Sequence, residues 1–174
     1  MSRRLAAISA LAALAIVTGA LWAHPNVQPL PAHATADLLI VEKRAHRLSV
    51  YSNGSLLREY SVSLGREPRG AKQREGDRRT PEGRYVIDRH NASSAFHKAL
   101  HVSYPSPGDI VRARVGGYVP GGEIMIHGLR NGLGWLGRAH LLADWTVGCI
   151  AVTNAEIDEL YRVVPDGIPI ELRP

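Results

Sequence analysis

The sequence is poor in cysteine and in aromatic residues. Cys149 is the only cysteine among 174 residues, so no disulfide can form within the chain. Aromatic residues make up 6% of the chain, and no zinc-finger, RRM or helix-turn-helix signature is present. Nothing in the sequence therefore points to a nucleic-acid partner. No internal repeat or second domain is evident, and the length suits one domain with one hydrophobic core.

The charge balance is positive, at +5 with histidine neutral. Such an excess suits an anionic membrane surface or an acidic polymer, but an ordinary soluble basic surface accounts for it equally well. Much of the charge lies in a glycine-rich segment from Gly65 to Pro81, where basic and acidic residues alternate. Two interpretations stay open for this loop. It lies over a functional site or an anionic glycan, or it is a solvated excursion.

The N-terminal residues predict export. Arg3 and Arg4 precede an apolar run from Leu5 to Ala23, the pattern of a signal sequence. The run is long for a signal peptide and barely long enough to span a bilayer, so a cleaved signal and an uncleaved anchor helix both stay open for residues 1–23. Both place the remainder outside the cytoplasm, because the arginines hold the N-terminus inside. The protein is expected in the periplasm, or anchored in the membrane facing it.

The remaining chain predicts a linker and one mostly β domain. Residues 24–36 contain three prolines and are interpreted as a linker, followed by a domain over residues 37–172. Asn53-Gly54, between two alternating segments, predicts a β-hairpin. The capping-box spacing that begins at Thr153 predicts a helix, which Pro165 ends. Further strands are predicted near residues 38–41, 84–88, 100–104, 124–126 and 168–172, and short helices near residues 107–115 and 136–142.

Cys149 and His127 stand in contexts that suit catalysis. Cys149 follows Gly148, which lets the backbone turn tightly and a substrate approach closely. A thiol with a pKa of about 8.5 needs a base or a positive environment to react at neutral pH. His127 ends an apolar strand and precedes Gly128, which is the placement expected of a general base. Taken singly, each residue also fits a structural role: a buried inert thiol, and a hydrogen-bonded core histidine.

Together these residues match a known family. Ile126-His127-Gly128, followed by Thr146-Val147-Gly148-Cys149-Ile150, resembles the active-site signature of the L,D-transpeptidase catalytic domain, the YkuD-type fold. Further matches, which look like the YafK-like murein branch of that family, occur at residues 79–83, 144–146, 148–154 and 165–167. The resemblance covers Asp37 to Leu172. It implies an L,D-transpeptidase-type β-sandwich with one or two short helices, preceded by the signal or anchor helix.

The resemblance also implies a mechanism on peptidoglycan stem peptides. Cys149 is the implied nucleophile, which attacks the carbonyl of the third stem residue, typically diaminopimelate, and D-alanine leaves. His127 is the implied base, which takes and returns the proton. The backbone N–H of Cys149, with that of Gly148, is expected to stabilise the oxyanion. Thr146 is a candidate for orienting the base or the cysteine loop, and Asp144 is a weaker candidate for orienting the base.

Two departures from the family pattern leave the outcome of the reaction open. Val147 stands where the family commonly has histidine, and Ala151 where many members have arginine. An amine acceptor gives a 3→3 cross-link or attaches a protein, such as a lipoprotein, to the wall. Water as acceptor makes the enzyme a murein amidase or carboxypeptidase. A third hypothesis, from another class, is a non-catalytic cell-wall-binding module with an inert thiol.

Other residues carry weaker predictions. Gly128, Tyr104 and Trp135 are candidates for a substrate groove, although aromatic residues more commonly pack in a core or at a rim. His97 and His101 have a spacing that binds zinc on a helix. No glutamate follows His97, no third ligand is evident, and the segment after it is predicted as strand. We therefore expect no metal and no cofactor, and contact with a membrane only through the N-terminal segment.

Overall fold

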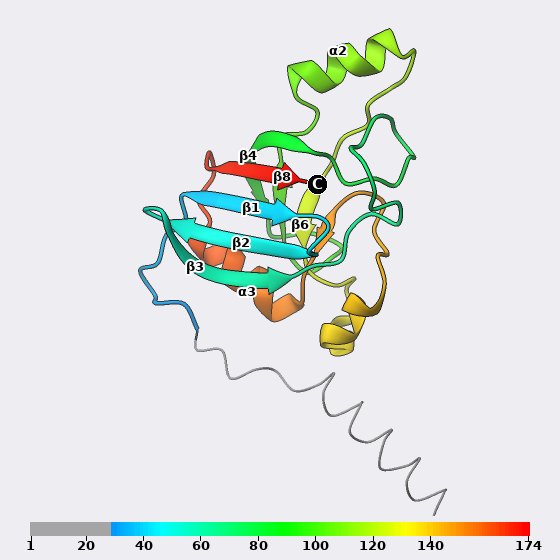
Figure 1. The fold of residues 1–174 in the computed structure, drawn as a ribbon. Helices are drawn as coiled ribbons and strands as arrows, with labels where there is room; N and C mark the ends of the chain where they lie inside the picture. Colours follow the sequence, from blue (N-terminus) through cyan, green and yellow to red (C-terminus); the bar gives the residue numbers. More distant parts are fainter. Residues whose placement is uncertain (1–28) are drawn as a thin grey trace, which may run out of the picture.

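The strands form one curled sheet with short helices around it (Figure 1). The computed structural model describes residues 29–174, so the predicted signal or anchor helix lies outside the described residues. Within this range, no helix is both long and apolar enough to cross a membrane. The strands are β1 (Leu38–Glu42), β2 (Arg47–Ser52), β3 (Ser55–Ser61), β4 (Gly83–Asn91), β5 (Ala99–Val102), β6 (Met125–His127), β7 (Ile150–Ala151) and β8 (Pro169–Arg173). The helices are α2 (Pro107–Val115), the 3₁₀ helix η1 (Gly134–Leu142) and α3 (Asn154–Val163).

The strand order is β3-β2-β1-β8-β4-β5-β6-β7, which confirms the prediction of a mostly β domain with short helices. β2 and β3 form the predicted hairpin, in which Asn53 and Gly54 have positive φ angles of 50° and 75°. A tight hairpin turn with the natural strand twist requires such angles. β4 pairs with β8 through its first residues and with β5 through its last, with a register shift between Ile87 and Arg89. This strand therefore belongs to both halves of the sheet.

The sheet curls back on itself near its last strand. Backbone bridges join Ser63 to Ala151 and Gly65 to Thr146, so the chain that continues from β3 runs beside β7. The interior holds fully buried aliphatic side chains from both halves, which include Leu39, Leu48, Ile87, Leu100, Ile126, Ile150 and Ile170. The short strands β6 and β7 are therefore held by backbone pairing and by the core.

Helix α3 follows β7 in the sequence and packs on the core. Its N-terminus is a capping box: the Thr153 hydroxyl accepts the Glu156 N–H at 3.3 Å, and the Glu156 carboxylate accepts the Thr153 N–H at 2.8 Å. Ile157, Leu160 and Val163 are buried along one face. Because α3 begins shortly after Ala151, the cap also fixes the end of β7.

Residues 29–36, interpreted above as the end of the linker, lie on α3. Leu30 is buried, and its N–H donates to the Glu159 carboxylate at 2.7 Å. The guanidinium of Arg162 donates hydrogen bonds to the backbone carbonyls of residues 30–32. The packed part of the chain therefore begins before the boundary that composition suggests, because one glutamate and one arginine bind this segment.

Truncation of the core face of α3 is expected to destabilise the fold. Leu160→Ala should lower the free energy of unfolding by about 3 kcal/mol, since Leu160 is fully buried and a cavity would remain. Leu56→Ala is the matched control, because Leu56 is 50% exposed and its loss should cost less than about 0.5 kcal/mol. Urea denaturation measures both, and equal losses would contradict this assignment of the core.

Candidate active site

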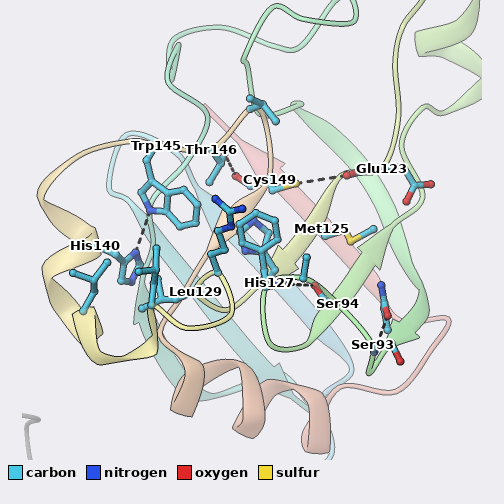
Figure 2. Close-up of a pocket in the computed structure, with 17 residues that line it drawn as sticks. Ser93, Ser94, Glu123, Met125, His127, Leu129, His140, Trp145, Thr146 and Cys149 are labelled. Carbon is cyan, nitrogen blue, oxygen red and sulfur yellow. Dashed lines mark hydrogen bonds between the residues drawn. The ribbon is translucent and has the colours of Figure 1, made fainter.

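Strands β6 and β7 bring His127 and Cys149 to the same face of the sheet. The strands are parallel, with Ile126 opposite Ile150 and His127 opposite Ala151. Cys149 lies two positions before Ala151, and alternate side chains of a strand point to the same side. The candidate nucleophile and the candidate base therefore converge, and both line one cavity of about 680 Å³ (Figure 2).

The His127 ring is held as one tautomer. Its Nδ1 lies 2.7 Å from the Gly128 carbonyl oxygen, which can only accept, so the proton is on Nδ1 and the lone pair on Nε2. The side chain is buried and packs against the Phe96 ring, with the ring centroids 4.6 Å apart. Burial lowers the pKa of His127, and the hydrogen bond to Gly128 only partly offsets this. At neutral pH the imidazole is therefore uncharged.

The Cys149 thiol is half-buried beside the start of β6. Its Sγ lies 3.5 Å from the Glu123 carbonyl oxygen, to which the thiol donates. Burial raises the pKa of Cys149, while hydrogen bonding with the Met125 backbone and the positive charge of Lys72 act in the opposite direction. The thiol and the imidazole are thus both neutral at rest, and a proton must move when the thiol reacts.

Thr146 fastens the turn that carries the cysteine. Its hydroxyl donates to the Cys149 carbonyl at 2.8 Å and accepts the Gly148 N–H at 3.1 Å. The Gly148 N–H, one of the two expected oxyanion donors, is thus already hydrogen-bonded to Thr146. Gly148 has a φ of 139°, and a Cβ there would lie 2.8 Å from the Arg79 carbonyl oxygen. This position requires glycine both for its backbone angle and for the close approach.

The basic loop over residues 65–81 packs against this turn. Asp77 organises it, since its carboxylate accepts hydrogen bonds from the Lys72 ammonium and from three backbone N–H groups of the loop. Lys72 is 6% exposed. The backbone N–H of Arg66 donates to the Thr146 carbonyl at 3.0 Å. The two ends of the loop are therefore packed on the cysteine segment, while most residues between them are exposed.

The cavity walls are mostly apolar and aromatic. Figure 2 shows Trp145 between His140 on one side and His127 and Cys149 on the other. The centroid of the Trp145 ring is 5.7 Å from that of His127 and 6.5 Å from that of His140. The other lining side chains include Ser94, Phe96, Met125, Leu129, Arg130, Leu133 and Leu136.

Three of these lining residues, Phe96, His140 and Trp145, are missing from the sequence prediction. Trp145 directly precedes the cysteine motif, so its position in the sequence could have identified it. Phe96 lies in the loop between β4 and β5, and His140 lies in η1. The path of such segments depends on contacts that the local pattern does not encode.

The three residues predicted for a substrate groove do not line this cavity. Tyr104 is 3% exposed, and its hydroxyl donates to the Pro120 carbonyl at 3.0 Å, so it packs in the core. Trp135 is 63% exposed on η1. Gly128 is buried against Asn154, whose Oδ1 would be 2.8 Å from an added Cβ. The contribution of Gly128 to the site is its carbonyl, which orients His127.

Asp144 and two further histidines have partners away from the cavity. Asp144 accepts the Leu64 N–H at 2.7 Å through one oxygen and contacts a surface histidine through the other, so it does not touch His127. His97 and His101 each pair with an aspartate. Within residues 29–174, no three potential ligands lie close enough together to hold a metal ion.

The sequence and the fold match one family. The model of the L,D-transpeptidase catalytic domain, YkuD, matches residues 36–172. Among curated proteins, the chain is 31% identical over 115 residues to YafK of Escherichia coli (strain K12), whose name places it among the L,D-transpeptidases. That match covers 65% of this chain and 39% of YafK, so the chain spans well under half of its relative.

Solved structures of other proteins have the same fold as this chain. The helical cell shape determining protein Pgp2 of Campylobacter jejuni superposes with a TM-score of 0.60 at 25% identity, over 80% of this chain and 48% of Pgp2. Bd1075 of Bdellovibrio bacteriovorus gives a TM-score of 0.54 at 24% identity, over 81% of this chain and 49% of its own. The predicted L,D-transpeptidase-type fold is thereby confirmed.

The pH dependence of Cys149 alkylation tests whether Cys149 and His127 are neutral in the folded protein. Alkylation of Cys149 by iodoacetamide requires the thiolate, so the midpoint of its pH profile should lie higher in the folded protein than in urea, where burial is lost. Mass spectrometry of the single cysteine reads out the rate without ambiguity. A folded-state midpoint below the unfolded one would instead indicate a thiolate–imidazolium pair.

Substitution of the glycine before the cysteine should disrupt the turn. Gly148→Ala is expected to lower the free energy of unfolding by about 2 kcal/mol, because the new Cβ collides with the Arg79 carbonyl at a strained backbone angle. Gly122→Ala is the matched control, since an added Cβ there meets nothing within 4 Å. Thermal unfolding compares the two variants, and an unchanged Gly148→Ala protein would refute the close approach.

Proposed function

Because this chain belongs to the L,D-transpeptidase catalytic domain family, we propose that it acts on peptidoglycan stem peptides through an acyl-enzyme on Cys149. One observation carries the proposal. The Cys149 thiol and the neutral His127 imidazole line one largely apolar cavity and lie on the same face of the paired strands β6 and β7. A nucleophile and a base in one largely apolar cavity are the arrangement that acyl transfer requires.

The first half of the reaction follows from the tautomer of His127. Nε2 carries the lone pair and takes the thiol proton while Sγ attacks the carbonyl carbon of the third stem residue, typically diaminopimelate. The imidazolium then returns that proton to the amine of the departing D-alanine. A thioester at Cys149 and a neutral His127 remain, so protons and bonds balance.

The oxyanion that forms during the attack needs a hydrogen-bond donor. The Gly148 N–H already donates to the Thr146 hydroxyl, so we assign the donor role to the N–H of Cys149. One such donor is worth about 3 kcal/mol of transition-state stabilisation. In this scheme Thr146 acts by holding the turn, through its second hydrogen bond to the Cys149 carbonyl.

The acceptor decides the product. An amine gives a 3→3 cross-link or attaches a lipoprotein to the wall, whereas water releases the peptide. Hydrolysis is the second candidate, because the two positions where the family commonly has histidine and arginine hold Val147 and Ala151 here. Val147 is 68% exposed beside the cavity and Ala151 is fully buried, so neither offers a polar group to an acceptor.

The setting of the reaction is part of the same proposal. The N-terminal arginines and apolar run favour a protein exported to the periplasm, either free or anchored to the membrane. The similarity to Pgp2, whose name refers to helical cell shape, supports a contribution to cell shape through the wall.

The full chain incubated with a disaccharide tetrapeptide should release D-alanine and carry a transient thioester mass at Cys149. Cys149→Ala should do neither, since no other thiol exists in the chain, and His127→Ala should slow acylation by about two orders of magnitude or more. Intact-mass spectrometry and muropeptide chromatography measure both steps.

The products separate the alternatives. New 3→3 dimers identify transfer, and tripeptide alone identifies hydrolysis. A carbapenem serves as a second acylating agent: a folded, reduced wild-type protein that forms no adduct with either reagent would instead be a non-catalytic wall-binding module. Circular dichroism of each variant confirms that loss of acylation is not loss of fold.

A further inference from the structure

An arginine lines the cavity that holds Cys149 and His127. Arg130 is exposed, so its side chain is open to a ligand. Within residues 29–174, its guanidinium makes no hydrogen bond and no ion pair. A guanidinium keeps its charge at every physiological pH, and its planar fork of N–H donors matches a carboxylate. The cavity therefore presents an anion-binding group that the reaction scheme above does not use.

The two histidines that line the cavity add no further positive charge at neutral pH. Burial lowers the pKa of His127, and burial followed by the charge of Arg138 lowers the pKa of His140 to about 4. Both rings are therefore neutral. Among the lining residues, the positive charge belongs to Arg130 alone.

The carboxylate of Glu123, which also lines the cavity, faces other partners. One of its oxygens lies 3.5 Å from the guanidinium of Arg89, and the other lies 3.8 Å from the ring of His101. Neither partner lines the cavity. Glu123 is therefore not the counter-ion of Arg130, and an anionic ligand would supply one.

The backbone on both sides of Arg130 is held in place. The Leu129 N–H donates to the Asn154 side-chain oxygen at 2.8 Å. Asn131 makes three hydrogen bonds with the backbone of residues 94–97, at 2.9, 3.2 and 2.9 Å, through its N–H, its amide nitrogen and its amide oxygen. Arg130 thus lies between two anchored residues, which limits the entropy lost when its side chain binds a ligand.

The donor stem peptide offers carboxylates close to the bond that breaks. One belongs to the departing D-alanine, and a second belongs to the side chain of diaminopimelate. Arg130 follows His127 by three residues, so their Cα atoms are at most about 11 Å apart, and both side chains line the same cavity. We propose that Arg130 selects and positions the donor stem peptide by binding one of these two carboxylates.

The proposal rests on the proposed function, because its ligand is the stem peptide. Binding of a disaccharide tetrapeptide to the full chain carrying Cys149→Ala tests it without turnover. Adding Arg130→Gln should raise Kd about tenfold, whereas Arg130→Lys, which keeps the charge but loses the fork, should raise it about threefold. An unchanged Kd in the Gln variant would overturn the proposal.

Arg114→Gln is the matched control for net charge. Arg114 is exposed on α2 and does not line the cavity. Its replacement removes the same charge and should leave Kd within about twofold. An equal loss in the Arg114 and Arg130 variants would mean that long-range attraction, not a contact, holds the peptide, and would overturn the proposal.

Two peptide analogues identify the carboxylate. One has the D-alanine carboxylate converted to an amide, and the other has lysine in place of diaminopimelate and so lacks the side-chain carboxylate. The analogue that has lost the bound carboxylate should bind about tenfold more weakly, and Arg130→Gln should weaken it no further, whereas the other analogue should stay sensitive to Arg130→Gln. If both analogues stay as sensitive as the parent peptide, Arg130 binds neither carboxylate and the proposal fails.

A probe without peptide separates this proposal from the proposed function. Iodoacetate carries a carboxylate and iodoacetamide the matching amide, and both alkylate Cys149. The ratio of the iodoacetate rate to the iodoacetamide rate should fall about threefold in Arg130→Gln and stay unchanged in Arg114→Gln.

The ratio and the turnover assay together decide between the two proposals. A fall in the ratio without acylation of the wild-type protein by tetrapeptide would refute the proposed function but keep the anion site. Turnover of tetrapeptide with an unchanged ratio would keep the function and overturn the role of Arg130.

Discussion

The parallel pairing of β6 with β7 is the constraint on which the site depends. Side chains alternate along a strand, so a slip of one residue would turn Cys149 to the face opposite His127. Interactions on both sides of β7 resist such a slip. Ala151 exchanges two backbone hydrogen bonds with Ser63, and Thr146 holds the Cys149 carbonyl. The face on which Cys149 and His127 lie is therefore fixed by the backbone pairing.

Most of the fold could be predicted because its signals are local. The Asn53-Gly54 turn and the capping box at Thr153 each lie within a few residues, and each defines an element that the structure contains. The beginning of the packed chain could not be predicted in this way. Its position depends on Glu159 and Arg162, more than a hundred residues away in sequence, which bind a proline-rich segment that resembles a linker by composition.

The candidate site shows the same division. A spaced motif is sufficient to pair His127 with Cys149, and the structure places both in one cavity. The rest of the wall is assembled from loops, so Phe96 and His140 carry no recognisable pattern. Aromatic residues occur in cores, in grooves and on surfaces, so the residue type alone does not distinguish these locations. Tyr104 and Trp135 were therefore predicted as groove residues, but Tyr104 is buried in the core and Trp135 is exposed. The sequence suggested Thr146 as a candidate for orienting the cysteine loop, but its hydrogen-bond partners, the Gly148 N–H and the Cys149 carbonyl, are known only from the backbone.

Burial of the thiol also affects how long the protein survives chemically. Peroxides oxidise thiolates much faster than thiols, so a cysteine whose pKa is raised by burial is a poor target for them. The chain has no second cysteine that could capture a sulfenic acid as a disulfide and so return it to the thiol. An oxidised Cys149 could therefore not be reduced by another thiol of the same molecule. The burial that raises the pKa of Cys149 also protects the thiol against irreversible oxidation.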